Sequence, residues 1–279
     1  MFEVSDLSVA EFGSMRMNRR SFAASSAALA AALSVPRVQA ADEATTKTAR
    51  SGKHPICVFT KPFNSLTFDE LADAIAEMGF DGIEAPIRRG GHIEAAQVKT
   101  ELPKLVKALE QRGLSITVMT SDINAADHPD TEEILSVASD QGIERYRLGY
   151  LRYDKKKPIA PQLDAWSIQL AKLADLNERL GIRGVYQNHA GSYALGAPIW
   201  DLQRVLQGID PQHLGVAYDI RHATVEGGTS WPLTFRMIQP HIDMVYVKDF
   251  RWKKTKVENV PLGDGLVQAE FFEMLAATG

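Results

Sequence analysis

The chain has 279 residues, of which 45% are hydrophobic and 24% charged, and it contains 20 Gly and 13 Pro. This composition is typical of a soluble globular domain and excludes disordered, collagen-like and coiled-coil chains. The formal net charge is −4 and Lys and Arg form no large cluster, so the sequence lacks the basic surface of a nucleic-acid-binding protein.

The first element in chain order is a targeting segment. Residues 1–40 combine an N-terminal extension with a signal peptide, in which Arg19 and Arg20 precede Ser, Phe and an Ala-rich stretch that ends in small residues at Ala40. We expect cleavage after Ala40, with Met17 as an alternative start to Met1. The apolar stretch is too short to span a bilayer, so no stable membrane anchor is predicted.

The paired arginines resemble a twin-arginine (Tat) export signal, which carries folded proteins across the membrane; a general secretory signal is the alternative. Either route predicts a periplasmic or extracellular location.

After residue 54, short apolar runs alternate with longer amphipathic stretches, which indicates repeated β–α units and a parallel sheet. The single cysteine, Cys57, lies in the first apolar run and is expected to be a core residue without chemistry. Seven strands are predicted, at residues 56–60, 82–85, 115–119, 145–148, 184–188, 215–219 and 244–248. Predicted helices include residues 67–78, 97–112, 163–180, 202–207 and 268–278.

A glycine follows several of these helical stretches directly before the next strand, as expected where a helix ends in a left-handed residue. No glycine-rich phosphate-binding motif follows any strand, which disfavours a doubly wound nucleotide-binding fold.

Seven strand–helix units predict an α/β fold of the (β/α)8 TIM-barrel type over residues 54–279. The sequence ends on a predicted helix and Gly279, at the point where strand eight would begin. We therefore expect a C-terminally truncated barrel that lacks strand eight and the last helix. The alternative is a natural seven-stranded barrel, which would leave two sheet edges unpaired.

Active sites of such barrels lie at the C-terminal ends of the strands. Polar residues are concentrated at these predicted positions: Glu84, Arg147, Gln187, Asn188, His189, Asp219, His222, Tyr246 and Lys248. Because side chains alternate along a strand, Gln187 and His189 share one face, as do Tyr246 and Lys248. If these faces point inward, the sequence places many more ionisable groups at one mouth than packing requires.

The motifs QNHAG, AYDIRHA, YVKDF and PLGDG, in this order and at these strand positions, resemble the xylose-isomerase-like barrels of the sugar phosphate isomerase/epimerase family. The resemblance covers essentially the whole chain after the signal segment. It implies a divalent metal held by a Glu of strand five, an Asp of strand six, a His of strand seven and a Glu of strand eight. It also implies proton transfer next to a carbonyl through an enediolate.

The sequence departs from the family pattern at two of these positions. Asp219 and His222 match, but Gln187 stands where Glu is usual and Tyr246 where His is usual, and the strand-eight Glu would lie beyond Gly279. Asp219 and Gln187 are therefore the expected metal ligands, with reduced affinity for Mn, Zn, Co or Mg, because an amide brings no charge and a neutral phenol is a poor ligand.

The resulting expectation is a sugar isomerase-like or epimerase-like enzyme that removes a proton next to a carbonyl of a small carbohydrate. The expected catalytic residues are Lys248, His189, His222 and Tyr246, the last as a hydrogen-bond donor to the oxyanion. The expected substrate-binding residues are Glu84, Arg147, Asn188 and His222. A lyase acting on an oxidised glycoside and a catalytically lapsed sugar-binding barrel are the alternatives, and homo-oligomerisation is left open.

Overall fold

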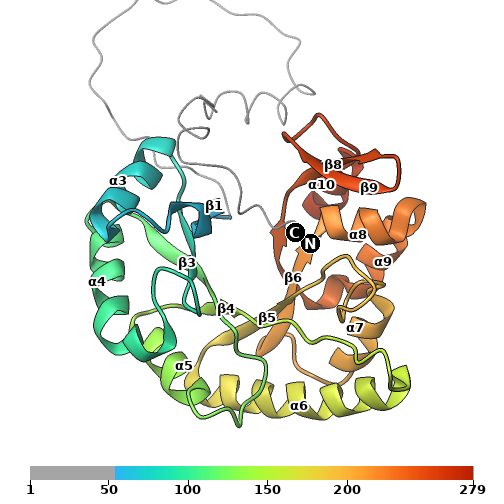
Figure 1. Cartoon of the computed structure of the whole chain (residues 1–279), viewed down its shortest axis with the longest axis horizontal. Coiled ribbons are helices and arrows are strands. Elements are labelled where there is room, and N and C mark those ends of the chain that lie inside the picture. The colour runs from blue at the N-terminus through green and yellow to red at the C-terminus, as the bar shows by residue number, and fades with distance from the viewer. Residues whose placement is uncertain (1–53, 279) are drawn as a thin grey trace, which may run out of the picture.

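The computed structural model describes residues 54–278; the predicted signal segment lies outside these residues. Seven parallel strands form one sheet in chain order, and Figure 1 shows the strongly curved row that they make. The strands are β1 (Cys57–Phe59), β2 (Gly82–Pro86), β3 (Ser115–Thr120), β4 (Arg145–Arg147), β5 (Arg183–Gln187), β6 (Leu214–Asp219) and β7 (Ile242–Tyr246).

Helices follow the strands and cover the convex side of the sheet (Figure 1). They are α3 (Phe68–Met78), α4 (Val98–Glu110), α5 (Thr131–Asp140), α6 (Ile159–Leu180), α7 (Trp200–Leu206), α8 (Ile220–Gly227), α9 (Trp231–Ile238) and α10 (Glu270–Ala276). Short 3-10 turns lie at Lys61–Phe63, Ala95–Gln97, Gly228–Ser230 and Gln239–His241.

The ends of α3 illustrate how local sequence fixes the helices. The Thr67 side chain accepts from the Glu70 backbone while the Glu70 side chain accepts from the Thr67 backbone, a capping box that satisfies donors of the first turn. The helix ends at Gly79, whose φ of 78° is favourable only for glycine. Gly181 ends α6 in the same way, with φ of 64°. Both glycines were predicted helix ends.

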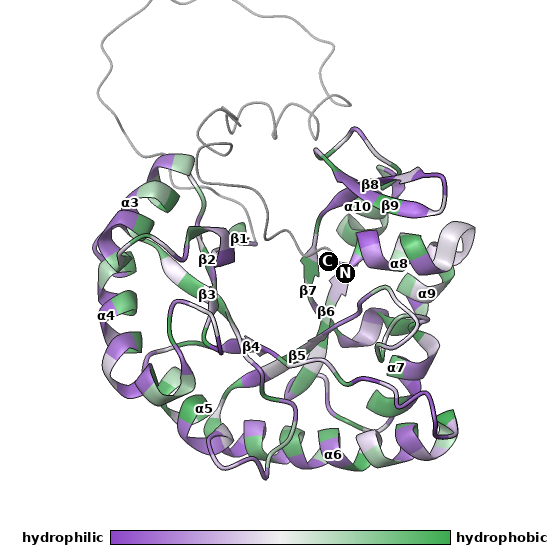
Figure 2. Cartoon of the chain, viewed as in Figure 1, coloured by the Kyte–Doolittle hydropathy of each residue, from purple (hydrophilic) through white to green (hydrophobic). Residues whose placement is uncertain are grey.

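The main core lies between the helices and the sheet. Each helix carries hydrophobic and hydrophilic residues on different sides (Figure 2), and the inward aliphatic side chains are almost fully buried, among them Leu71, Leu102 and Leu173. A second, smaller apolar cluster of Val118, Val185 and Ala217 lies apart from this core, with Met244 and Tyr246 packed against it. Small side chains on β5 and β6 thus leave the concave side of the sheet to the polar residues.

Within residues 54–278 no strand joins β7 to β1, and Figure 2 shows these two strands at opposite ends of the row. The observed fold is an α/β TIM-barrel-like arrangement with seven parallel strands, as predicted. None of its helices in the described range could cross a membrane.

Two features differ from the sequence prediction. The predicted strand 244–248 is shifted, because β7 ends at Tyr246, which is paired with Asp219, the last residue of β6. Lys248 therefore lies just beyond the strand. An antiparallel hairpin then follows, β8 (Asp249–Lys253) and β9 (Lys256–Val260), which the sequence analysis did not predict.

Candidate active site

The predicted polar residues do meet at the C-terminal ends of the strands. Glu84 is on β2, Arg147 ends β4, Gln187 ends β5, Asp219 ends β6 and Tyr246 ends β7. His222 follows in the first turn of α8. The geometry joins these side chains in a continuous series of contacts across the concave side of the sheet.

One end of the site is a buried ion pair. Arg147 Nε donates to Glu84 Oε1 at 2.9 Å, and the Thr120 hydroxyl donates to the same oxygen. The two charged side chains are only 6% and 3% exposed, so each neutralises the other and neither charge is free for a ligand. Glu84 and Arg147 were predicted to bind substrate; here they hold each other and, through Arg147, the next residue of the series.

That next residue is Tyr150, and it fixes the orientation of Gln187. Arg147 Nη1 donates to the Tyr150 hydroxyl at 3.2 Å, and this hydroxyl donates to Gln187 Oε1 at 2.7 Å. The amide nitrogen of Gln187 then donates to Asp219 Oδ2 at 2.8 Å. The amide oxygen of Gln187 thus faces Tyr150, and its N–H group faces the carboxylate.

Asp219 is the centre of the site and is completely buried. Lys248 Nζ donates to its Oδ2 at 2.7 Å, and the backbone N–H of His222 donates to Oδ1 at 3.1 Å. Burial alone would raise the pKa of Asp219, but the charge of Lys248 and these hydrogen bonds outweigh it and lower the pKa to about 2. The carboxylate is therefore permanently ionised, and Lys248, 42% exposed, connects it to solvent.

The two histidines of the site stack, with ring centroids 4.0 Å apart and an interplanar angle of 34°. Their hydrogen bonds fix the tautomers, because a guanidinium only donates and a carbonyl only accepts. Arg221 Nη1 lies 3.0 Å from His222 Nδ1, so the His222 proton is on Nε2, 3.6 Å from Asp219 Oδ2. His189 Nδ1 lies 2.8 Å from the Ala190 carbonyl oxygen, so Nδ1 carries the proton and Nε2 a lone pair.

Both rings are neutral at physiological pH. Burial is the main cause and lowers the pKa of His189 below its usual value and that of His222 to about 3. The charge of Lys248 lowers both pKa values further, against the opposing effect of Asp219. His189 thus offers a neutral nitrogen base at Nε2.

Tyr246 contributes a protonated phenol. Its hydroxyl is buried, and burial together with the charge and hydrogen bonding of the nearby Glu84 carboxylate raises its pKa well above 10. The Lys248 ammonium lies 5.5 Å from the centre of its ring. The Tyr246 hydroxyl therefore keeps its proton and is a hydrogen-bond donor beside Glu84.

Asn188 has a different position from the one expected of a substrate contact. It is 1% exposed, and its side chain bonds both backbone groups of Asp219, donating to the carbonyl at 3.0 Å and accepting from the N–H at 2.7 Å. Both polar atoms of its amide are used in placing Asp219.

The donors around Asp219 do not fit a divalent metal. Among residues 54–278 no three His, Cys, Asp or Glu side chains are grouped as metal ligands. The Asp219 oxygen that would face a cation already accepts from an ammonium and an amide N–H, and the amide oxygen of Gln187 points away to Tyr150. A metal next to two N–H donors would be repelled, so the predicted ligands Asp219 and Gln187 form no metal site in this arrangement.

Sequence reasoning missed the part that three residues play in these contacts. Thr120 and Tyr150 link the ion pair to Gln187, and Arg221 donates to His222. Arg221 had a signal in the sequence, because it directly precedes His222 in the motif AYDIRHA. Tyr150 had the signal of an aromatic residue at the barrel mouth, which suits stacking on a sugar ring, but not its hydrogen bonds to Arg147 and Gln187. Thr120 had no signal, since its role arises from strands that are neighbours only in the folded sheet.

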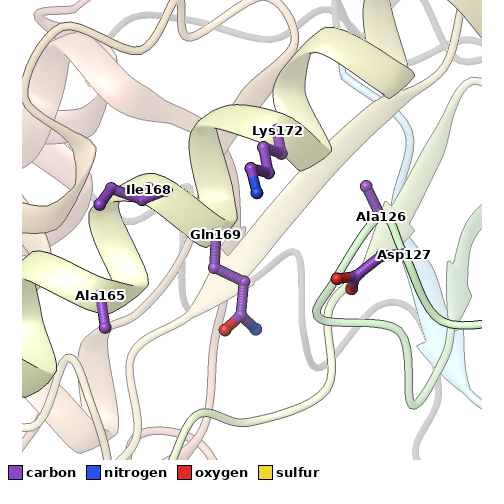
Figure 3. Close-up of a pocket in the computed structure, with 6 residues that line it drawn as sticks. All are labelled: Ala126, Asp127, Ala165, Ile168, Gln169 and Lys172. Atoms are coloured by element: carbon purple, nitrogen blue, oxygen red, sulfur yellow. The ribbon is translucent and has the colours of Figure 1, made fainter.

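A surface hollow of about 220 Å³ lies elsewhere, between the loop after β3 and the outer side of α6. Figure 3 shows Gln169 and Lys172 of α6 opposite Asp127 of the loop. Gln169 is bound to the Asn124 carbonyl at 2.8 Å. None of the residues of the candidate site lines this hollow.

Comparisons with solved structures show the same fold. The probable 3-DHS dehydratase AsbF of Bacillus anthracis matches with a TM-score of 0.64 and 15% identity, over 81% of this chain and 89% of that protein. The 3-keto-D-glucoside 4-epimerase YcjR of E. coli matches with a TM-score of 0.61 and 17% identity, over 81% and 88%.

A xylose isomerase-like TIM barrel protein of Mycobacterium smegmatis, whose structure contains magnesium, matches with a TM-score of 0.63 and 13% identity, over 81% of this chain and 87% of that protein. The curated proteins contain no match to the sequence.

The model of one protein family matches residues 72–279, well over half of the chain. Together with the seven-stranded fold, this match establishes that the chain belongs to the xylose isomerase-like TIM barrel family.

Proposed function

We propose that this chain is an exported enzyme that isomerises or epimerises a small carbohydrate or keto-sugar by removing a proton next to a carbonyl. We further propose that protein side chains, and not a divalent metal, stabilise the enediolate. The observation that carries the proposal is the fixed tautomer of His189, which leaves a neutral lone pair on Nε2. The His189 ring stacks on His222, which in turn lies 3.6 Å from the Asp219 oxygen that Lys248 binds.

The proposed reaction begins with proton abstraction. His189 Nε2 takes the proton from the carbon next to the carbonyl, and the electron pair of the C–H bond moves to the carbonyl oxygen, which gives an enediolate. Lys248 Nζ supplies the positive charge for the developing oxyanion, and the Tyr246 hydroxyl supplies a hydrogen bond. Transfer of the proton to the former carbonyl carbon, while the hydroxyl proton of the first carbon passes to the oxyanion, moves the carbonyl to the first carbon and gives isomerisation. Protonation of the first carbon from its opposite face, by solvent or a second donor on that face, re-forms the original carbonyl and gives epimerisation.

The fold neighbours support a carbohydrate ligand only by analogy, because their identities show the fold alone. One of them is named as an epimerase of a keto-glucoside and another as a dehydratase. The dehydratase makes a lyase the second candidate: the same carbanion would expel a leaving group from the next carbon instead of being reprotonated.

The test is solvent deuterium exchange. The chain, expressed from Met17, is incubated in deuterated water with D-fructose, D-glucose and 3-keto-D-glucose, and carbon-bound deuterium is measured by NMR. We expect incorporation next to the carbonyl of at least one sugar, undiminished by EDTA. The variant His189→Gln should lose roughly 10²–10⁴-fold of the exchange rate, whereas His128→Gln, a histidine exposed after β3, should keep it.

Each other outcome contradicts a defined part of the proposal. Exchange that EDTA abolishes and Mg²⁺ or Mn²⁺ restores would contradict the metal-free mechanism. An unsaturated product would identify a lyase. Sugar binding without exchange would identify a lapsed, sugar-binding barrel.

A further inference from the structure

Arg221 has a buried N–H group that the protein leaves without a partner. Arg221 is half-buried in the first turn of α8, and its Nε is buried and makes no hydrogen bond within residues 54–278. Its guanidinium is held from two sides: Nη1 donates to His222 Nδ1 at 3.0 Å, and its central carbon lies 5.9 Å from the centre of the Phe250 ring. Buried N–H groups in folded proteins are nearly always paired, so this one indicates an acceptor that arrives with a ligand.

The charges around Arg221 are not balanced. Asp219 is the only carboxylate of the described chain whose charge acts appreciably on Arg221, whose pKa is lowered by burial. That carboxylate is already bound by Lys248 at 2.7 Å and by Gln187 at 2.8 Å. His222 accepts from Arg221 through Nδ1 and so adds no charge; two cations, Arg221 and Lys248, therefore face one carboxylate, and one positive charge remains uncompensated.

We infer that Arg221 binds a negatively charged group of the substrate, and that this group is a carboxylate. The inference rests on the proposed function, since it specifies the substrate of the same site as an acidic sugar. A guanidinium presents parallel N–H groups that fit the two oxygens of a carboxylate. The residual charge of +1 balances a monoanion, whereas a phosphate dianion would remain half unneutralised.

The position of Arg221 places the anionic group of the substrate near the proposed base, His189. Arg221 bonds His222 at 3.0 Å, and the His222 ring stacks on His189 with centroids 4.0 Å apart, so a carboxylate bound to Arg221 lies one ring away from the base. The substrate class is therefore a sugar acid, with its carboxylate close to the carbon that loses the proton.

The experiment compares three sugars that differ only at carbon six: D-glucuronate, D-glucose and D-glucose 6-phosphate. Their dissociation constants for the full chain are measured by ligand-observed NMR at one fixed ionic strength. We expect glucuronate to bind at least roughly tenfold more tightly than glucose, the contribution of one charge-assisted hydrogen-bond pair. Arg221→Gln should reduce this ratio to about one, and Arg221→Lys, which keeps the charge without the fork, should retain part of it.

The matched control is Arg236→Gln on α9, where an exposed arginine is removed with the same loss of charge; it should leave the preference for glucuronate unchanged. Circular dichroism establishes that each variant is folded. Equal binding of glucuronate and glucose, or a preference that survives in Arg221→Gln, would overturn the inference. If glucose 6-phosphate bound most tightly of the three sugars, the anionic group recognised by Arg221 would be a phosphate and not a carboxylate.

Deuterium exchange separates this inference from the function on which it rests. Preference for glucuronate without exchange into any sugar would leave the anion site standing and remove the proposed enzyme activity. Exchange into neutral sugars without an Arg221-dependent preference would keep the activity and remove the anion site.

Discussion

At the scale of single residues, the departure from the family pattern at Gln187 fits the contacts around Asp219. The Lys248 ammonium supplies the positive charge that balances Asp219. The site therefore needs no metal for this purpose, and no second carboxylate at position 187 to hold one. An amide fits there instead, because Gln187 donates to Asp219 with one end and accepts from Tyr150 with the other. A carboxylate in its place would face Asp219 directly and repel it.

Asn188 can be tested as a residue that holds Asp219 in place and does not itself contact the substrate. Asn188→Ala removes the two buried hydrogen bonds that its side chain makes to the backbone of Asp219, so we expect the free energy of unfolding to fall by about 2–4 kcal/mol. Urea denaturation followed by circular dichroism measures the change. Asn64→Ala, which removes an exposed hydrogen bond to the Gly90 carbonyl, should cost no more than about 0.5 kcal/mol. Equal effects of the two substitutions would contradict this role.

The sequence predicted which residues meet at the site but not how each is used. Residue type and strand alternation suffice to bring Gln187, His189, Asp219 and Lys248 to one mouth. The pairing of Glu84 with Arg147 could not be predicted, because it joins residues on β2 and β4, with Thr120 of β3 between them. The tautomers likewise depend on partners, Ala190 and Arg221, that only the folded loops supply.

At the scale of elements, the hairpin β8–β9 shows what pattern reading misses. Residues 249–253 do alternate between polar and apolar side chains, but residues 256–260 do not alternate regularly, and the two short runs together contain only four apolar residues. The turn contains no Asn-Gly or Asp-Gly pair. Instead Lys254 adopts a φ of 58°, a left-handed conformation that is uncommon for lysine and that the residue type does not predict. By contrast, helices that end in glycine, such as α3 and α6, were predicted to within a few residues.

Asp249 organises the loop that follows this hairpin. Its Oδ1 accepts from the backbone N–H of Phe250 at 2.8 Å and of Val267 at 3.0 Å, and its Oδ2 accepts from Gly263 at 3.0 Å and Gly265 at 2.9 Å. A side chain on Gly265 would overlap the carboxylate, since its Cβ would lie within 2.1 Å of Oδ1. Asp249 is thus a structural acid, and its neighbour Lys248 pairs with Asp219 instead.

We expect Asp249→Asn to lower the unfolding free energy by about 2–3 kcal/mol at neutral pH, because the new amide N–H group faces two backbone donors. Burial raises the pKa of Asp249, but the four backbone bonds outweigh it and the pKa is lowered. Its contribution to stability is therefore present above the pKa of an unfolded Asp, about 4, and is lost as the pH falls through the lowered folded value.

Urea denaturation of wild type and Asp249→Asn over a pH series measures this effect, and the difference between them should shrink below about pH 4. Asp264→Asn, an exposed acid in the same loop, is the control and should match wild type at every pH. A difference for Asp249→Asn that persists unchanged in acid would contradict the assignment.

At the scale of the whole molecule, the order of the strands was the most predictable property. Seven apolar runs separated by helices allow few arrangements, since parallel neighbours need a crossover and crossovers are right-handed. Sheet order and family membership agree with that prediction. The periplasmic or extracellular location was predicted from residues 1–40, which lie outside the described range, and it stays a prediction.

Export has its own test. Expressed from Met17 in a bacterium with a Tat pathway, the protein should appear outside the cytoplasm with Ala41 as its first residue, as determined by mass spectrometry. Replacement of Arg19 and Arg20 by Lys should leave it unprocessed in the cytoplasm if the Tat route is used. Processing that continues in this variant would favour the general secretory route, and an N-terminus that still includes residues before Ala41 would contradict the cleavage site.

The series of contacts from Glu84 through Arg147, Tyr150, Gln187 and Asp219 to Lys248 has a thermodynamic consequence. Each of these side chains already has its rotamer fixed by the next, so a ligand immobilises few additional rotatable bonds on arrival and loses little affinity to side-chain entropy. The same linkage makes the residues interdependent. Removal of one member releases its neighbours, so the costs of two substitutions in the series should sum to more than the cost of the double variant.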